Sequence, residues 1–247
     1  MRLTDRIHLV GSGEPDWALS DPRDSQVYLV STQDGHVVVD TGTGRSVARI
    51  LAEVARDGLR PADIAWILLT HAHADHAGGG AAWRRAIPGV RIAASAETAP
   101  WLAAADEDAT SVDRARAAGI YPADYHLEGF EVDRPLQDDS ELTIADLLFR
   151  AVPSPGHAAG HLAYLVDIEG TSTLFSGDAL FPGGRILLQD TWDCDLHAAL
   201  RTVERLSGLG AERLLAGHLP PVLDGAVSHF AAANERIARL LVPASIG

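Results

Sequence analysis

The chain has 247 residues, of which 47% are hydrophobic, and it carries a formal net charge of -14. Its 20 basic residues are all arginines, and an acidic chain of this kind repels polyanions, so nucleic acids and anionic membrane surfaces are excluded as partners. This length and hydrophobic content favour one layered α/β domain over residues 1–247.

Cysteine usage and the first residues bear on the compartment. The only cysteine, Cys194, excludes an internal disulfide and is typical of a reducing cytosol. The opening stretch "MRLTDRIHLV" lacks the apolar core of a signal peptide, and no apolar run reaches membrane-spanning length. We therefore expect a cytoplasmic protein.

The first part of the chain alternates strand and helix signals. Apolar runs predict four strands, over 26–30, 36–42, 64–69 and 90–95. The run at 64–69 is continuous, which is typical of a strand covered on both faces. Residues 46–58 predict an amphipathic helix that ends at Gly58. The apolar face of that helix consists of Val47, Ile50, Leu51 and Val54.

After residue 95 the strand signal fades for about 45 residues. Residues 97–119 predict helix and 119–130 a loop, and strand signals then resume. The later predicted strands are 141–144, 147–152, 162–166, 172–178 and 212–218. A helix capped by Asp195 and ended by Gly208 precedes the last of them, and an amphipathic helix over 226–241 closes the chain.

The segment "LLTHAHADHAGGG", residues 68–80, follows the third apolar run directly and concentrates ligand-type side chains. Neutral imidazole and carboxylate are ligands of divalent metals such as zinc. In an extended or turning segment alternate residues point the same way, so His71 and His73 can face one ion. Asp75 and His76, beyond the turn, can face another.

Three more ligand-type residues each follow a predicted strand, beside small residues. They are His157 in "PSPGHAAGH", Asp178 in "FSGDALF" and His218 in "LLAGHLPP". Together with "THAHADH" and the early "VVDTG", these motifs resemble those of the metallo-β-lactamase superfamily. The resemblance spans nearly the whole chain and implies a four-layer αβ/βα sandwich with its metals at one end.

The resemblance also implies a role for each motif residue. His71, His73 and His157 would hold one divalent ion, Asp75, His76 and His218 a second, and Asp178 would bridge the two. Zinc is the expected metal, with iron or manganese as alternatives. Asp40 would orient a metal ligand or the backbone beside it. His161 is either a packed histidine that supports a ligand or a residue closer to the reaction.

A hydroxide shared by two ions would be the nucleophile, since coordination lowers the pKa of water toward about 7. Asp75 would then move a proton to the leaving group. We expect a hydrolase that cleaves an ester-like acyl bond, a thioester or a lactone, of a small and partly apolar substrate. The alternatives are a mononuclear iron persulfide dioxygenase, a phosphodiesterase of the same fold and a binding protein without catalysis.

The branches of the superfamily differ at recognisable places. β-Lactamases of this fold lack the bridging aspartate and are typically exported, so antibiotic hydrolysis is disfavoured. Glyoxalase II carries a basic, helical C-terminal domain, whereas only residues 219–247 follow His218 here and lysine is absent. Phe181 stands where lactonases often place a tyrosine.

Residues 96–140 exceed what the minimal fold needs and predict a helical insertion that covers the mouth of the site. An apolar substrate pocket needs apolar and aromatic lining. The candidate substrate residues are Trp17, Trp101, Tyr121, Tyr125, Phe181, Arg185 and Trp192. We expect replacement of Trp101 or Tyr121 to change KM or substrate preference rather than metal content.

Overall fold

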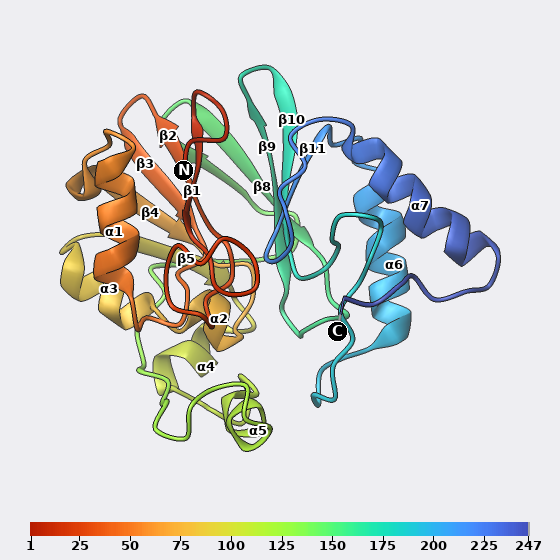
Figure 1. Cartoon of the computed structure of the whole chain (residues 1–247), viewed down its shortest axis with the longest axis horizontal. Coiled ribbons are helices and arrows are strands. Elements are labelled where there is room, and N and C mark those ends of the chain that lie inside the picture. The colour runs from red at the N-terminus through yellow and green to blue at the C-terminus, as the bar shows by residue number, and fades with distance from the viewer. Residues whose placement is uncertain (247) are drawn as a thin grey trace. The chain divides into compact units, whose positions relative to one another are not determined.

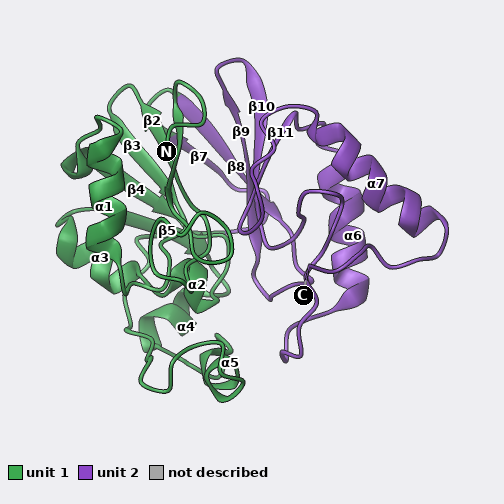
Figure 2. Ribbon diagram, in the orientation of Figure 1, with its two compact units in different colours: residues 1–136, 144–146 green, residues 137–143, 147–247 purple. Residues whose placement is uncertain are grey.

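The structure is a computed structural model that describes residues 1–246 (Figure 1). The chain separates into two compact units (Figure 2). Unit 1 comprises residues 1–136 and 144–146, and unit 2 comprises 137–143 and the chain from 147 onward. Each unit is built on its own β-sheet. The expectation of one domain over the whole chain stays a prediction.

Unit 1 contains a six-stranded sheet in the order β1-β2-β3-β4-β5-β6. Its strands are β1 (Ile7–Gly11), β2 (Val27–Thr32), β3 (Gly35–Val39), β4 (Ile64–Leu68), β5 (Arg91–Ser95) and β6 (Arg134–Leu136). β1, β2 and β3 pair antiparallel, whereas β3, β4, β5 and β6 pair parallel. The carboxyl ends of β3 and β4 therefore meet at one edge of the sheet.

Helices α1 (Val47–Arg56) and α3 (Gly80–Ala86) pack on this sheet, as Figure 1 shows. The buried side chains of α1 are those of a helical stripe, and Gly58 follows the helix with a φ of 82°. Leu51, predicted on the same face, is only partly buried. The other helical segments are η1 (Pro61–Asp63), α2 (Ala74–Ala77), α4 (Ala99–Ala104) and α5 (Val112–Ala117).

Unit 2 contains a five-stranded sheet in the order β11-β10-β9-β8-β7. Its strands are β7 (Glu141–Ile144), β8 (Leu147–Pro153), β9 (Leu162–Ile168), β10 (Thr171–Gly177) and β11 (Arg213–Ala216). β9 runs antiparallel to β8 and β10, and β11 is parallel to β10, so β8, β10 and β11 end at the same edge. Helices α6 (Leu196–Ser207) and α7 (Ala226–Ala238) complete its core.

The mixed α/β architecture and nearly all predicted elements are confirmed. Two strands, β1 and β6, were not predicted. β6 has only three residues, one of which is Pro135, so it is too short to show a period of two. The helical signal over 97–119 corresponds to two short helices, α4 and α5. Ala105, in the left-handed region with a φ of 51°, ends the first of them. Among the described residues no helix is both long and apolar enough to cross a membrane.

Candidate metal centre

The histidine-rich segment of unit 1 begins where β4 ends. Leu68 closes the strand, and the chain turns through His71 and His73 before the single turn of α2. His71 Nε2 lies 3.1 Å from His73 Nδ1, and both side chains are buried. Two Zn–N bonds of about 2.05 Å at a tetrahedral angle place their nitrogens about 3.3 Å apart, so this pair has the spacing of two ligands of one ion.

His76 is oriented by Asp40. The two residues follow neighbouring parallel strands, and Asp40 Oδ2 lies 2.8 Å from His76 Nδ1. A carboxylate accepts, so Nδ1 carries the hydrogen and Nε2 keeps the lone pair that a metal needs. Asp40 Oδ1 also accepts from the Thr70 amide at 2.8 Å. Burial raises the pKa of Asp40 against the opposing effects of the His76 and Thr70 contacts.

The backbone after Asp40 holds the same loop. Thr41 donates to the His76 carbonyl from both its amide and its hydroxyl, each at 2.7 Å. The Gly79 amide donates in turn to the Gly42 carbonyl at 2.8 Å. The "DTG" turn is therefore hydrogen-bonded to the residues in and just after α2. Asp40 lies in this turn with a φ of 62°, a conformation that aspartate tolerates better than most residues.

The two carboxylate oxygens of Asp75 lie in different surroundings. Its Oδ2 lies 3.4 Å from His76 Nε2, so the two residues present ligand atoms on the same side. Its Oδ1 accepts a hydrogen bond from the Tyr121 hydroxyl at 2.8 Å, and the Tyr121 oxygen accepts from the Asp75 amide at 3.1 Å. Burial, followed by the charge of Asp75, raises the pKa of Tyr121, so this hydroxyl stays protonated and donates.

Unit 2 carries the other predicted ligands at the shared edge of β8, β10 and β11. His157 follows β8, and its Nδ1 lies 3.2 Å from the Leu187 carbonyl oxygen. A carbonyl only accepts, so Nδ1 is the donor and Nε2 is the nitrogen that carries the lone pair. Gly156 has a φ of 132°, and a Cβ there would overlap the backbone of Ala199 in α6. The glycine thus lets the loop that carries His157 rest on the first turn of that helix.

Asp178 lies between two histidines of this unit. Its Oδ2 is 3.6 Å from His157 Nε2 and 3.5 Å from His218 Nε2. The parallel pairing of β10 with β11 produces this neighbourhood, since Gly217 donates to the Gly177 carbonyl at 2.8 Å.

His161 supports Asp178 rather than presenting a ligand atom. The Asp178 amide donates to His161 Nε2 at 3.1 Å, so Nδ1 is protonated and lies 2.9 Å from Ser154 Oγ. Both ring nitrogens are thereby engaged. Which of the two predicted roles His161 plays stays a prediction.

The chemistry of these donors fits divalent metal ions. Each unit gathers imidazole nitrogens with a carboxylate at its strand ends, at spacings of 3.1–3.6 Å. His71, His73, His76, His157 and Asp178 are buried, whereas Asp75 and His218 are half-buried. In both units the outer nitrogen of a histidine is tied to an oxygen acceptor. Such outer contacts are the usual companions of metal-ligating histidines. Thr70 and Ser154, which touch Asp40 and His161, were missed from the sequence; the position of Thr70 directly before His71 was the available signal.

The predicted substrate residues lie in different surroundings. Trp17 and Trp192 are 44% and 57% exposed, which is unusual for tryptophan, and the Arg185 side chain is exposed as well. Trp101 is half-buried against the core of unit 1. Phe181 is fully buried, with its ring centroid 6.3 Å from that of His218. The roles of these residues in substrate binding stay predictions.

Tyr121 and Tyr125 are only 6% and 5% exposed, and both hydroxyls are engaged. Tyr125 donates to the Thr43 carbonyl at 3.0 Å, while Tyr121 donates to Asp75. Little of either ring is left for a substrate. The expectation that Tyr121 affects substrate preference rather than metal content is therefore revised, because its hydroxyl contacts a predicted metal ligand.

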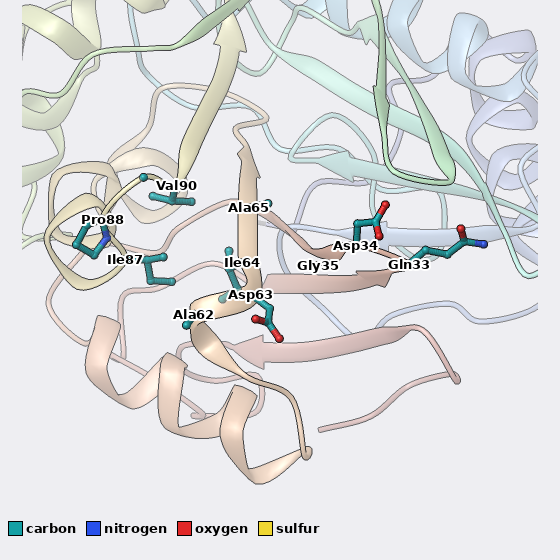
Figure 3. Close-up of a pocket in the computed structure, with 11 residues that line it drawn as sticks. Gln33, Asp34, Gly35, Ala62, Asp63, Ile64, Ala65, Ile87, Pro88 and Val90 are labelled. Carbon is teal, nitrogen blue, oxygen red and sulfur yellow. The ribbon is translucent and has the colours of Figure 1, made fainter.

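A pocket of about 540 Å³ in unit 1 lies elsewhere (Figure 3). It is lined by the 33–35 turn, the segment from Ala62 to Ala65 and the loop before β5. This is the amino end of β4, whereas His71 follows its carboxyl end. None of the predicted site residues lines this pocket, so we do not assign it to the metal centre.

A two-sheet α/β chain whose strand ends gather histidine and aspartate defines a class of metal-dependent hydrolase folds. Comparison with known protein families identifies the family: residues 20–218 match the model of the metallo-beta-lactamase superfamily. The chain belongs to this superfamily.

Among curated relatives, the chain is 32% identical over 180 residues to a hydroxyacylglutathione hydrolase of Halorhodospira halophila, covering 72% of this chain and 56% of the relative. It is 30% identical to the Cupriavidus taiwanensis enzyme of the same name, covering 87% and 68%. It is 28% identical to the lactamase-like protein vrtG of Penicillium aethiopicum, covering 88% and 58%. The chain thus spans little more than half the length of the first and last of these relatives.

Solved structures confirm the fold. The subclass B3 metallo-beta-lactamase BJP-1 of Bradyrhizobium japonicum superposes with a TM-score of 0.72 at 21% identity, over 97% of this chain and 92% of that one. The metallo-beta-lactamase GOB-18 of Elizabethkingia meningoseptica gives a TM-score of 0.73 at 17% identity, over 97% and 89%. The predicted fold class is therefore correct.

Proposed function

We propose that this protein is a metal-dependent hydrolase that cleaves a thioester or lactone bond in a small, partly apolar substrate. The observation that carries the proposal is the state of His76 and His157. Each has its Nδ1 tied to an oxygen acceptor, which leaves Nε2 as a ligand nitrogen beside a carboxylate. The resemblance to hydroxyacylglutathione hydrolases supports an acyl-bond substrate.

The ligand assignment follows the superfamily pattern. By that pattern, His71, His73 and His157 would hold one ion, Asp75, His76 and His218 would hold the other, and Asp178 would help to hold both. Divalent ions, when bound there, would lower the pKa of water toward about 7 and so supply a nucleophile at neutral pH, and they would polarise the carbonyl of the substrate. Zinc suits this mixture of imidazole and carboxylate, and iron or manganese are the alternatives.

The protein side chains have separate tasks in this scheme. Asp178 and the histidines orient the reacting groups, and His161 and Asp40 keep the ligands in place. Asp75 is the residue proposed to move a proton to the leaving group, because its carboxylate lies at the ligand cluster and its Oδ1 is held by the Tyr121 hydroxyl. A thiolate or alkoxide leaving group needs only this one proton, and no serine or cysteine nucleophile is required.

Substrate binding is proposed to involve exposed aromatic and cationic side chains. Trp17 and Trp192 expose large apolar surfaces that an acyl group could cover, and Arg185 offers a cation for a carboxylate. The net charge of -14 opposes a polyanionic substrate. Cytoplasmic localisation and a small-molecule substrate, with neither nucleic acid nor membrane as partner, belong to the same proposal.

The test compares bond types at matched protein and metal concentrations near neutral pH. We expect kcat/KM for a small aliphatic or aromatic thioester or lactone to exceed that for bis-p-nitrophenyl phosphate at least about a hundredfold. A phosphodiester needs its non-bridging charge neutralised by further cations, whereas the net charge of this chain, -14, opposes an anionic substrate. Equal rates would favour the phosphodiesterase alternative.

Elemental analysis of the purified protein tests the metal. Two equivalents of zinc, iron or manganese are expected per chain. A single iron together with oxygen consumption on a persulfide would instead identify the dioxygenase alternative.

A further inference from the structure

Tyr121 forms two hydrogen bonds with Asp75. Its hydroxyl donates to Asp75 Oδ1 at 2.8 Å and accepts from the Asp75 amide at 3.1 Å. The Asp75 carbonyl is held as well, since it accepts from the Ser25 amide at 3.1 Å and the Ser25 hydroxyl at 2.8 Å. The backbone and one carboxylate oxygen of this residue are therefore held by Ser25 and Tyr121, which lie outside the histidine motif.

Because of these hydrogen bonds, the two carboxylate oxygens of Asp75 have different partners. Oδ1 is turned toward the tyrosine, and Oδ2 lies 3.4 Å from His76 Nε2, the nitrogen that the Asp40 contact leaves as a ligand. A rotation that exchanged the two oxygens would break the part-buried hydrogen bond that Tyr121 donates to Oδ1, at a cost in free energy. The carboxylate is thus prepared to bind through Oδ2 alone.

The segment that carries Tyr121 also packs against the end of α2 and the start of α3. The Tyr125 hydroxyl occupies the space where a side chain at Gly78 would begin, and the Phe130 ring does so at Gly80. Tyr121 and Tyr125 also pack on each other, with ring centroids 5.0 Å apart. The glycines after the histidine motif therefore admit the aromatic residues of the 96–140 insertion.

We propose that Tyr121 is a positioning residue for the metal ligand Asp75, and that the 96–140 insertion is in this way part of the metal-binding structure. The inference rests on the proposed function, because it takes Asp75 as a ligand. It assigns to the insertion a task distinct from covering a substrate.

The experiment compares Tyr121→Phe with Tyr125→Phe in the full chain. Each change removes one buried hydroxyl that donates to a protein oxygen, but only Tyr121 touches a ligand. Zinc affinity is measured by competition with a chromophoric chelator, and the visible spectrum is recorded with two equivalents of Co²⁺. The melting temperature of each metal-free protein reports the purely structural effect.

We expect Tyr121→Phe to bind one ion as tightly as the wild type and the second about 10- to 100-fold more weakly, with an altered Co²⁺ spectrum. Tyr125→Phe should keep the wild-type affinities and spectrum, while both metal-free variants lose similar amounts of melting temperature.

Two results would overturn the inference while leaving the proposed function intact: wild-type zinc affinity and spectrum in Tyr121→Phe, or equal weakening in both variants. A wild-type protein that takes up only one ion would overturn the inference and the two-metal proposal together. The comparison therefore separates the two failures.

Discussion

Asp178 contacts three histidines, two through its carboxylate and one through its backbone amide. Its carboxylate lies beside His157 and His218, and its amide is held by the ring of His161. A residue at the end of β10 is fixed in this way from its backbone and faces two imidazoles with its side chain. Replacing it should affect both proposed ions at once.

We expect Asp178→Ala to lower the metal content below two equivalents and to reduce kcat/KM by more than the roughly 100-fold typical of residues that only support a ligand. Asp178→Asn, which keeps the size but weakens the donor, should lose less metal. Metal content and initial rates with the best acyl substrate provide the measurement. Asp138→Ala, an exposed change of equal charge in unit 2, is the control. A fully loaded and active Asp178→Ala protein would contradict the role proposed for Asp178.

At this scale the candidate ligand residues could be proposed from the sequence, because each motif places a ligand-type side chain shortly after an apolar strand. Their supporting contacts could not. The hydroxyl of Tyr121 reaches Asp75 across 46 positions of the chain, and nothing in the local pattern of either segment indicates that contact. Burial also changed the interpretation of Tyr121 and Tyr125, since an aromatic residue in an insertion has the same sequence signature whether it lines a pocket or packs inside.

Among the elements, helix α6 shows most directly how sequence determines a boundary. Asp195 adopts an extended conformation before the first turn, and its carboxylate accepts from the Ala198 amide at 3.0 Å. The Asp195 amide donates to the Gly156 carbonyl at 2.9 Å, so the helix start is also attached to the loop that carries His157. The predicted cap is confirmed, and it connects helix formation with the position of a proposed ligand.

We expect Asp195→Ala to lower the melting temperature by about 2–4 °C at neutral pH, because the first turn of α6 loses its side-chain acceptor. The Ala198 amide lowers the pKa of Asp195 in the folded state, so the stabilisation is fully present above the unfolded value of about 4. It is lost as pH falls through the lower folded value. Thermal unfolding between pH 8 and pH 3 measures the difference between variant and wild type, with Asp138→Ala again as the control. A difference that already disappears between pH 8 and pH 5 would contradict this account.

Elements with a strong period were predicted well, and short ones were not. α1 and α6 each carry several apolar residues at helical spacing, so their type and ends follow from the pattern. Strand β6 has three residues, and its position depends on pairing with β5 rather than on its own composition. Pairing of this kind is a tertiary contact, which local periodicity does not record.

For the molecule as a whole, the net charge of -14 acts over longer distances than any single contact described above. It repels anions at distances of a Debye length, which is about 30 Å in 10 mM salt and about 8 Å in 150 mM salt. The acidic residues are scattered through the sequence rather than gathered in one run, so the repulsion belongs to the molecule and not to one segment.

Salt should therefore distinguish anionic from neutral substrates. Between 10 mM and 150 mM salt, kcat/KM for an anionic acyl thioester should rise about two- to tenfold, while that for a neutral thioester of the same acyl group stays nearly constant. Initial rates at fixed pH and metal concentration give both values. A fall in kcat/KM for the anionic substrate would show that a local cation such as Arg185 outweighs the net charge.

The three successive glycines at 78–80 limit how this protein can change. Side chains at Gly78 and Gly80 would occupy the volume now taken by Tyr125 and Phe130, and one at Gly79 would meet Thr41. A recombination library that exchanges residues 96–140 for segments from relatives thus cannot treat the exchange as independent of the residues at positions 78–80. Grafts with small residues opposite positions 78 and 80 would leave voids, whereas bulkier residues at those positions would exclude the present insertion. Evolution of the insertion and of the glycine run is therefore expected to be correlated, although the two lie more than 40 positions apart from Gly78 to Tyr125.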